Sequence, residues 1–397
     1  MLEGVNVALG VTGSIAAVTT VELAHELRRR GASVRAVTTE SAQGIVHPWA
    51  LEFATGESPV TEITGDVEHV GLCGREGWAD VLLIAPATAN TVGKIAAAID
   101  DTPVTTCATT ALGADVPVVI APAMHEPMYD HPGVLDAIER VESWGVEFVD
   151  PRIEEGKAKI ATADAIALAT ARATGDRPLA DRHVVVTAGA TAERVDPVRL
   201  LTNRSSGRTG RAVARACYAA GADVTLVQGT GSPAPANEDT LDADPTTYAT
   251  VDRVESAAEM VAATSEAVAD ADALVSTAAI ADYTVDARDE KIRSGQSELT
   301  LALSPTPKLL DEVRGGHPDL PIVGFKTETS GDDAAMVERA RDLRERVRCA
   351  FVVANDASVM GRPDTRALLV DDDVDEYAGS KAGLGTRVAD RLAATLG

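Results

Sequence analysis

Residues 5–14, VNVALGVTGS, and residues 183–191, HVVVTAGAT, share one design and decide the expected fold. In each stretch, a run rich in β-branched residues ends in a turn of small residues. Such a turn leads a strand directly into a helix, and apolar residues at helical spacing occur in both halves of the chain. Alternating strands and helices predict a mostly parallel sheet with helices on both faces. We therefore expect two α/β domains, one beginning at each stretch.

The remaining apolar runs extend this alternation along the chain. Further strands are expected at 34–37, 79–85, 116–121, 224–227, 273–277, 322–325 and 351–354. Helices are expected at 18–30, 212–220, 257–268 and 334–347. A polar Gly/Pro stretch at 172–181 separates the halves, and the 397 residues exceed the ~250–300 at which single domains usually stop growing. The expected organisation is a first domain over 1–172, a linker over 173–182 and a second domain over 183–397.

The charge balance is strongly acidic, with 61 Asp and Glu against 36 Lys and Arg and a formal net charge of −25. Only seven of the basic residues are lysines, and aromatic residues make up 3% of the chain. Because the acids are spread along the whole chain, we favour adaptation to a salt-rich cytoplasm over an acidic surface for one basic partner. The same charge argues against non-specific binding to nucleic acids or anionic membranes. We also expect folding to depend on salt.

Several sequence features indicate a cytoplasmic protein. The first residues lack the basic region of a signal peptide, and no apolar run approaches the ~20 residues that a membrane span needs. The four cysteines are widely separated and show no metal-binding spacing. We expect reduced, mostly buried thiols, and the sequence assigns no metal ligands.

Small polar residues follow consecutive strands of the first half. The turn Gly10–Ser14 offers glycines and a hydroxyl group at a helix start and is a candidate phosphate cradle. Taken alone, the motif is more simply explained by the glycine that any tight strand–helix turn needs. Similar clusters follow the next strands at Thr38–Ala42, Pro86–Thr91 and Ala121–Tyr129. Ligands of parallel sheets bind beyond the carboxyl ends of the strands, so we expect these clusters to share one pocket. An isolated histidine such as His69 is more often structural or exposed than catalytic.

These motifs carry a family resemblance. Gly13–Ala17, a His ahead of a Trp-Ala-Asp strand start, Ala85–Asn90 and Pro122–Met124 together resemble the flavin-dependent cysteine decarboxylases. Within that group, the first half is similar to the phosphopantothenoylcysteine decarboxylase domain of a bifunctional family. The resemblance implies a flavodoxin-like domain that binds FMN, forms trimers and has its active site between subunits. It implies FMN contacts at Gly13, Ser14, Thr39, Ser41, Thr88 and Asn90.

The resemblance also implies a catalytic base at His69 and substrate contacts at Met124 and His125, but two departures affect this site. The family commonly has Asn after its Pro-Ala-Met segment, whereas this chain has His125, which can also donate a hydrogen bond to a carboxylate. Bacterial members carry a Cys in a flap that covers the substrate, and the corresponding residues 150–160 contain none. Cys73, close to His69 in sequence, is a candidate substitute for that proton donor.

The second half contains another candidate anion-binding helix start at residues 205–211, SSGRTGR. The alternative is a packing turn, because Gly210 would permit close contact between helix and sheet. The spacing alone leaves both interpretations open. Lysines are scarce in this chain, yet Lys291, Lys308 and Lys326 all lie in this half. A lysine is usually a solvated surface group, but its rarity on an acidic protein that must bind anions brings the functional and surface interpretations close to even.

The second half resembles the phosphopantothenate–cysteine ligase domain, the usual C-terminal partner of the decarboxylase. Matching motifs occur in order at 187–189, 196–199, 203–207, 278–283, 290–292, 324–325 and 354–356. The resemblance implies a dimeric Rossmann-like domain that joins 4′-phosphopantothenate to cysteine through an acyl-nucleotide made from CTP or ATP with Mg²⁺. It implies catalytic roles for Lys291 and Asn203. It implies nucleotide contacts at Ala279, Asp282, Lys291, Pro307, Lys308, Leu309, Leu310, Phe325 and Arg346.

The combined expectation is a bifunctional enzyme that makes 4′-phosphopantothenoylcysteine and decarboxylates it to 4′-phosphopantetheine. Trimeric and dimeric contacts together imply a homo-oligomer, of which a dodecamer is one arrangement. One alternative keeps the ligase and makes the flavin domain inactive or regulatory. A second alternative is a non-catalytic, flavin-binding regulatory subunit. An NAD-dependent dehydrogenase is disfavoured because the first turn lacks GxGxxG.

Overall fold

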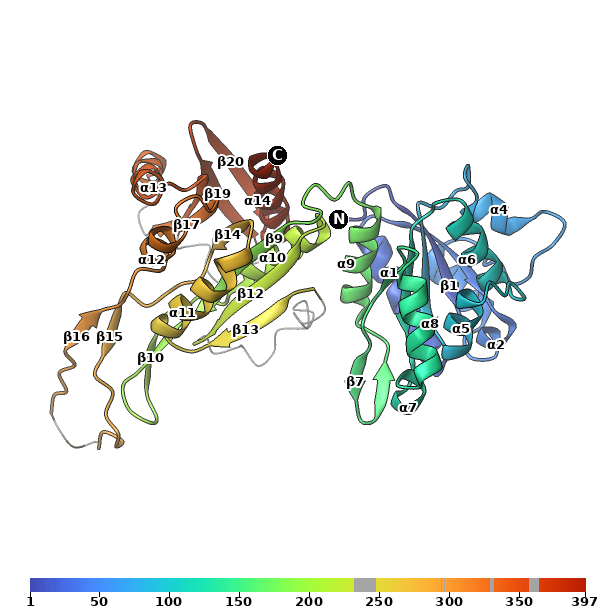
Figure 1. Cartoon of the computed structure of the whole chain (residues 1–397), viewed down its shortest axis with the longest axis horizontal. Helices are drawn as coiled ribbons and strands as arrows, with labels where there is room; N and C mark the ends of the chain where they lie inside the picture. The colour runs from blue at the N-terminus through green and yellow to red at the C-terminus, as the bar shows by residue number, and fades with distance from the viewer. Residues whose placement is uncertain (232–247, 294, 296, 329–331, 357–363) are drawn as a thin grey trace. The chain divides into compact units, whose positions relative to one another are not determined.

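The computed structural model describes residues 1–231, 248–293, 295, 297–328, 332–356 and 364–397. The chain divides into two compact units, Met1–Asp176 and Arg177–Gly397. The division falls inside the stretch expected to be a linker, although helix α9 (Ala163–Thr174) extends into that stretch. Each unit is an α/β structure built on its own sheet (Figure 1).

The first unit contains a five-stranded, all-parallel sheet in the order β2-β1-β3-β4-β6. Its strands are β1 (Asn6–Val11), β2 (Ser33–Thr38), β3 (Val81–Ala87), β4 (Val118–Pro122) and β6 (Glu147–Phe148). This is the flavodoxin-like order, in which the chain reverses its direction of travel between β1 and β3. The expected flavodoxin-like fold class is therefore confirmed for the first half.

Helices cover both faces of this sheet. They are α1 (Thr20–Arg29), α2 (Glu40–Gln43), α3 (Pro48–Thr55), α4 (Glu68–Cys73), α5 (Ala89–Ala96), α6 (Pro103–Gly113), α7 (Glu126–Tyr129), α8 (Pro132–Glu142) and α9. Side chains of β1 alternate between the faces: Leu9 packs in one core with Leu27 of α1, and Ala8 packs in the other with Val104 of α6. The helix expected from residue 18 begins at Thr20, because Ile15–Thr19 form a 3₁₀ helix, η1.

A small antiparallel sheet is added beside this core. It contains β5 (Met124–His125), β7 (Arg152–Glu154) and β8 (Lys157–Lys159) in the order β5-β8-β7. These strands were not predicted from the sequence.

The second unit contains an eight-stranded sheet in the order β13-β12-β9-β14-β17-β18-β19-β20. The strands are β9 (His183–Ala190), β12 (Asp223–Thr230), β13 (Thr250–Val254), β14 (Ala273–Ser276), β17 (Ile322–Glu328), β18 (Phe351–Asp356), β19 (Asp364–Val370) and β20 (Val374–Ser380). The first six in that order are parallel and follow the Rossmann order, with a switch point between β9 and β14. The expected Rossmann-like class is confirmed, and an unpredicted antiparallel pair, β19 and β20, extends the sheet.

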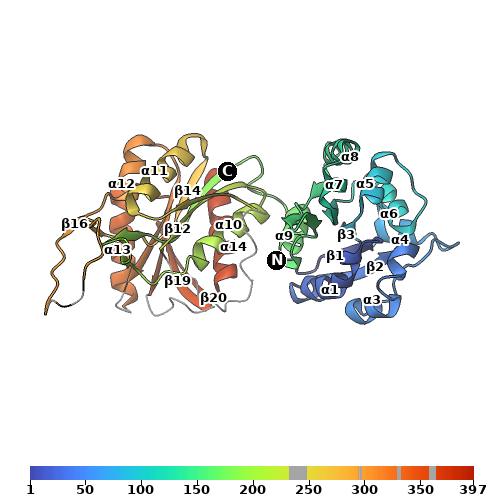
Figure 2. The same ribbon diagram turned by 90° about the horizontal axis from the view of Figure 1, so that it is seen from below.

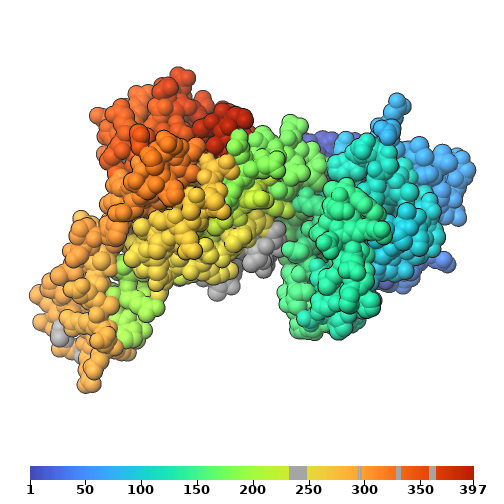
Figure 3. Space-filling model, in the orientation of Figure 1, coloured from blue at the N-terminus to red at the C-terminus, as the bar shows by residue number. Residues whose placement is uncertain are grey.

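The helices of this unit are α10 (Arg208–Ala219), α11 (Ala257–Ala267), the short 3₁₀ helix η3 (Val268–Asp270), α12 (Leu309–Gly316), α13 (Asp333–Val347) and α14 (Lys381–Leu396). Helix α11 lies beside α12, and α10 lies beside α14 (Figure 2). Two antiparallel ribbons lie outside the main sheet. They are β10 (Ala192–Arg194) with β11 (Leu200–Thr202), and β15 (Tyr283–Val285) with β16 (Leu303–Pro305), which projects from the unit (Figure 3).

Candidate functional site

Hydrogen bonds connect the loops after three strands of the first unit at the carboxyl edge of its sheet. The Thr12 hydroxyl, after β1, donates to the carbonyl of Pro86 at 2.8 Å and accepts the N–H of Thr88 at 3.3 Å, both near the end of β3. The Ser14 hydroxyl donates to the carbonyl of Ala123, after β4, at 3.1 Å. The polar clusters that the sequence placed after separate strands are therefore neighbours.

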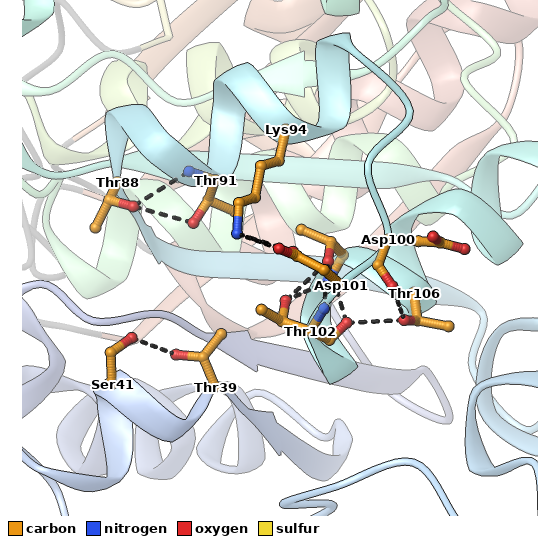
Figure 4. A network of polar contacts seen from close by, with 10 residues as sticks. Thr39, Ser41, Thr88, Thr91, Lys94, Asp100, Asp101, Thr102 and Thr106 are labelled. Carbon is orange, nitrogen blue, oxygen red and sulfur yellow. Dashed lines mark hydrogen bonds and ion pairs between the residues drawn. The ribbon is translucent and has the colours of Figure 1, made fainter.

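Gly13 and Ser41 meet where the loops after β1 and β2 touch. A Cβ placed on Gly13 would lie 2.7 Å from the Cβ of Ser41, which is closer than real side chains approach. The hydroxyls of Thr39 and Ser41 lie 3.0 Å apart (Figure 4). Gly13 thus has a packing role, and its absent side chain lets Ser41 approach the turn. Gly13, Ser14, Thr39 and Ser41, all expected at one flavin site, are brought together.

Thr88 and Asn90 lie at the start of α5. The Thr88 hydroxyl accepts the N–H of Thr91 at 3.2 Å and lies 3.0 Å from the Thr91 hydroxyl, as Figure 4 shows. Thr39 caps α2 in the same way, accepting the N–H of Ala42 at 3.2 Å. A hydroxyl has one donor and two acceptor positions, so capping leaves each oxygen able to contact a phosphate or ribityl group. Asn90 is exposed in the first turn of α5.

The expected substrate segment pairs with the expected flap. Met124 lies opposite Ala158 and His125 opposite Lys157 in the ladder between β5 and β8. The N–H of Glu126 also donates to the carbonyl of Gly156, at the tip of the β7–β8 hairpin, at 3.3 Å. Residues 150–160 are therefore a hairpin anchored on the segment that follows β4, and the His125 side chain is exposed.

His69 is not brought to this edge. After α4, the backbone N–H of Trp78 donates to the carbonyl of Gly71, and the N–H of Ala79 donates to the carbonyl of Leu72. Strand β3 begins two residues later. Helix α4 therefore lies near the amino ends of the strands, and Figure 1 shows it at the opposite end of the unit from α2 and α7. His69 is half-buried, and its buried Nδ1 has no hydrogen-bond partner among the described residues.

Cys73, the candidate proton donor, is fully buried at the end of α4. A hydrogen bond with Cys107 of α6, together with burial, raises the pKa of the Cys73 thiol well above its usual range. Cys107 is buried in the same core. The two thiols pack against each other, away from the flap at residues 150–160.

The second unit has a cavity of about 600 Å³ at the carboxyl ends of β14, β17 and β18, next to the switch point of its sheet. Ligands of open α/β sheets bind at this place. The helix start at 205–210 forms one wall, and residues 276–282 form another. The expected nucleotide residues in its lining are Ala279, Asp282, Pro307, Lys308, Leu309, Leu310, Phe325 and Arg346.

Gly210 resolves the two interpretations of the helix start at 205–211. A Cβ on Gly210 would lie 2.5 Å from the Cβ of Ala188 in β9, so the glycine is required for close packing of α10 on the sheet. Ser205, Ser206 and Gly207 nevertheless line the cavity. The packing interpretation therefore holds for Gly210, while the residues before it face the candidate ligand site.

Two cavity cations are paired with carboxylates. Lys308 forms an ion pair with Asp282 at 2.5 Å, and Arg346 pairs with Asp311 of α12. Asn203 lies beside the lining: its Nδ2 donates to the carbonyl of Ala279 at 2.7 Å, and its Oδ1 accepts the N–H of Ser205 at 3.0 Å. Asn203 thus connects the two walls.

Lys291 lies outside this cavity. It is exposed, on the segment after β15, and the next residue, Ile292, is buried. The N–H of Ile292 donates to the carboxylate of Asp196 at 3.0 Å, and its carbonyl accepts from Arg199 at 3.1 Å. The Asp-Pro-Val-Arg motif at 196–199 therefore fixes the segment that carries Lys291.

Lys381 is a cavity residue that the sequence analysis missed. It is half-buried at the first position of α14 and lines the cavity. It is one of only seven lysines and directly follows the serine that caps α14, so lysine scarcity, which singled out Lys291, Lys308 and Lys326, could also have found it.

Neither a metal cluster nor a membrane helix is found in the described ranges. No three or more His, Cys, Asp or Glu side chains gather there in a way that could hold a metal ion. In the same ranges, every helix is too short or too polar to cross a membrane.

Two family models match the chain. One is described as Flavoprotein and matches residues 1–175; the other is described as the DNA/pantothenate metabolism flavoprotein C-terminal domain and matches residues 179–396. A relative from Thermococcus kodakarensis is 45% identical over 373 residues, 93% of this chain and 89% of the relative. One from Methanocaldococcus jannaschii is 33% identical over 397 residues, covering 99% of this chain and 94% of that protein. Both bear the name coenzyme A biosynthesis bifunctional protein CoaBC.

A solved structure described as an FMN-dependent cysteine decarboxylase, SpaF, is 32% identical to this chain. The match covers 44% of this chain and 100% of the other, with a TM-score of 0.40.

Proposed function

This chain belongs to the family of coenzyme A biosynthesis bifunctional proteins, and we propose on that premise which site performs each of its two reactions. The second unit joins 4′-phosphopantothenate to cysteine at the expense of a nucleotide, and the first unit decarboxylates the product to 4′-phosphopantetheine. The observation that carries this assignment is that both family domains are present, in order, across nearly the whole chain. The dehydrogenase alternative is not needed to explain either domain.

For the decarboxylase, the proposed flavin site is the carboxyl edge formed by the loops after β1, β2 and β3. The hydroxyls of Ser14, Thr39, Ser41 and Thr88 gather there, and hydroxyl and backbone N–H donors fit the phosphate of FMN. When bound, FMN would supply the oxidation and reduction that make loss of CO₂ from a β-thiol carboxylate possible. The β7–β8 hairpin, anchored on Met124 and His125, would exclude water over the substrate. The exposed His125 imidazole would hold the substrate carboxylate.

His69 acts in this proposal as a base supplied across a subunit contact. Within one chain it lies near the opposite edge of the sheet from the proposed flavin site. A catalytic role therefore requires a second copy that brings its own His69 to this edge, in agreement with the trimeric contacts that the resemblance implies. We propose a cytoplasmic homo-oligomer with trimeric decarboxylase contacts and dimeric ligase contacts, and the dimer would bring Lys291 of one chain towards the cavity of another.

For the ligase, the cavity in the second unit is the proposed nucleotide site. CTP or ATP would bind against Ala279, Pro307 and Phe325, with Mg²⁺ as counter-ion of its phosphates, and Asn203 would hold the acyl intermediate between the two walls. Lys291 would neutralise charge that develops as the pantothenate carboxylate attacks the α-phosphate.

The test is a product assay by mass spectrometry. Purified chain in high salt receives 4′-phosphopantothenate, cysteine, Mg²⁺ and either CTP or ATP. We expect 4′-phosphopantetheine as the final product. A reaction that stops at 4′-phosphopantothenoylcysteine would instead support the alternative of an active ligase with an inactive or regulatory flavin domain, and no product at all would contradict both assignments.

A further inference from the structure

Helices α10 and α14 of the second unit cross in very close contact near their first turns. A Cβ placed on Gly385 of α14 would lie 2.7 Å from the carbonyl carbon of Ala212 in α10, so only glycine fits at the crossing. Lys381 lies one turn before Gly385, and Arg208 lies one turn before Ala212. The crossing therefore holds two cationic side chains together at one end of the cavity, and both line it.

Three positively charged side chains, those of Lys381, Arg208 and Arg211, lie close together here. Burial, together with the charges of Arg208 and Arg211, lowers the pKa of the Lys381 ammonium group. The two guanidinium groups carry the same charge as Lys381, and this repulsion opposes the charged form of the lysine. A cost of this kind is typical of groups arranged for a ligand rather than for stability.

Lys381 differs in its partners from two other cations of the cavity, Lys308 and Arg346. Lys308 and Arg346 each hold a carboxylate of the chain. Within the parts of the chain that the structure describes, no carboxylate forms an ion pair with Lys381. In a protein with 61 acidic residues, a half-buried lysine without an acidic partner stands out. Its ammonium group is available to an anion that enters the cavity.

We propose that Lys381, with Arg208, binds a phosphate group of a ligase substrate at this end of the cavity. The inference rests on the proposed ligase function and adds a binding residue to it. Two substrates carry this chemistry: the nucleotide, as a polyphosphate, and 4′-phosphopantothenate, as a phosphate monoester. An ammonium group beside a guanidinium would bind either phosphate through charge-assisted hydrogen bonds.

The experiment compares Lys381→Gln and Lys381→Arg with the matched control Arg387→Gln, in the full chain at one salt concentration. Arg387 lies on the same helix but is exposed and does not line the cavity. We expect Lys381→Gln to raise KM for one phosphate-bearing substrate by about tenfold or more, because a charge-assisted hydrogen bond is lost. Lys381→Arg should recover part of the effect, and Arg387→Gln should leave KM unchanged. The substrate whose KM rises identifies the phosphate that is bound.

Two further measurements separate binding from folding and from the proposed function. Since Lys381→Gln relieves repulsion, its melting temperature should equal or exceed that of the wild type, whereas a structural lysine would lower it. Calorimetric titration with inorganic phosphate and tripolyphosphate tests binding without turnover, and weaker binding of either anion by Lys381→Gln supports the proposal even if the wild type forms no product. Unchanged KM values and anion affinities, or a lowered melting temperature with KM values unchanged, would overturn it.

Discussion

The carboxylate of Asp196 accepts the backbone N–H of Ile292 at 3.0 Å, although 96 positions separate the two residues in the chain. The same carboxylate accepts the N–H groups of Val198 at 2.8 Å and Arg199 at 2.9 Å. Burial alone would raise the pKa of Asp196, but the backbone donors of Ile292 and Val198 and the Arg199 guanidinium outweigh it and lower the pKa to about 2. One buried carboxylate thus anchors the segment that carries Lys291.

We predict that Asp196→Asn destabilises the second unit most strongly at neutral pH. The pKa of Asp196 is lower in the folded state than in the unfolded chain, so its contribution to stability is present above about pH 4 and is lost as the pH falls towards 2. The difference in melting temperature between wild type and variant should therefore narrow as the pH is lowered from neutral to near 3. The exposed Asp289, on the same segment, provides the control variant Asp289→Asn. A difference that does not change with pH would contradict this account.

Ligase kinetics of Asp196→Asn test its positioning role. Freeing the Lys291 segment should lower kcat with little change in the nucleotide KM, because the cavity walls do not include Asp196. If Lys291→Ala and the double variant are equally impaired, the two residues act as one unit. Additive losses would show that Asp196 affects the reaction independently of Lys291 and would contradict the positioning role.

Gly13→Ala should disrupt the proposed flavin site. The added methyl group would meet Ser41 at 2.7 Å between the two Cβ atoms, so the loop after β1 or the start of α2 must shift. We expect loss of bound flavin absorbance and a melting temperature lowered by several degrees, since overpacking a tight contact costs about 1–3 kcal/mol. Gly93→Ala is the matched control: nothing lies within 4 Å of a Cβ there, and alanine favours the helix. Normal flavin retention in Gly13→Ala would show that the loops adjust freely.

The alternation of strands and helices could be predicted from the sequence because buried parallel strands are continuous apolar runs, as at Val81–Ala87. The β19–β20 pair could not, since β20, with exposed and half-buried positions along Val374–Ser380, lacks such a run. The strands Met124–His125 and Lys157–Lys159 were also missed. They are two and three residues long, and long-range pairing rather than local composition defines them.

The candidate sites were predictable to the extent that their residues follow strands. Thr39 and Thr88 follow strands of the first sheet, and Asp282 follows a strand of the second. Each therefore lies at the carboxyl edge of its own sheet. Lys381 follows an antiparallel strand and reaches the cavity only through the crossing at Gly385, which no local pattern indicates. The distance of His69 from the flavin edge likewise depends on tertiary structure, because its position after β2 in sequence does not reveal at which edge of the sheet α4 lies.

The four cysteines should be unreactive in the native protein. All are buried, and burial raises the pKa of Cys217 to about 12 and that of Cys349 to about 11. Because the thiolate is the reactive form, a thiol reagent near pH 8 should modify almost no cysteine before unfolding. In denaturant the same reagent should count four thiols. If the reagent rapidly modifies both the native wild type and native Cys73→Ser, a cysteine other than Cys73 is accessible. That result would contradict the burial of all four thiols.

Stability should rise with salt, because repulsion within a chain of net charge −25 outweighs its surface ion pairs. Many of these pairs are exposed, such as Arg366 with Asp333 at 2.7 Å, and exposed pairs contribute only about 0–1 kcal/mol each. Salt weakens both the ion pairs and the repulsion. The repulsion acts between many charges over longer distances, so it is screened more strongly as the Debye length falls from ~10 Å at 0.1 M to ~3 Å at 1 M.

The measurement is a series of thermal melts followed by circular dichroism, from about 0.1 M to about 3 M KCl. We expect the melting temperature to rise steadily and the native signal to be lost reversibly on desalting. Sucrose at matched osmolarity is the control, since it strengthens burial without screening charge. If sucrose stabilises as much as KCl, the effect is one of hydration rather than charge, and a melting temperature independent of salt would show that the ion pairs already balance the repulsion.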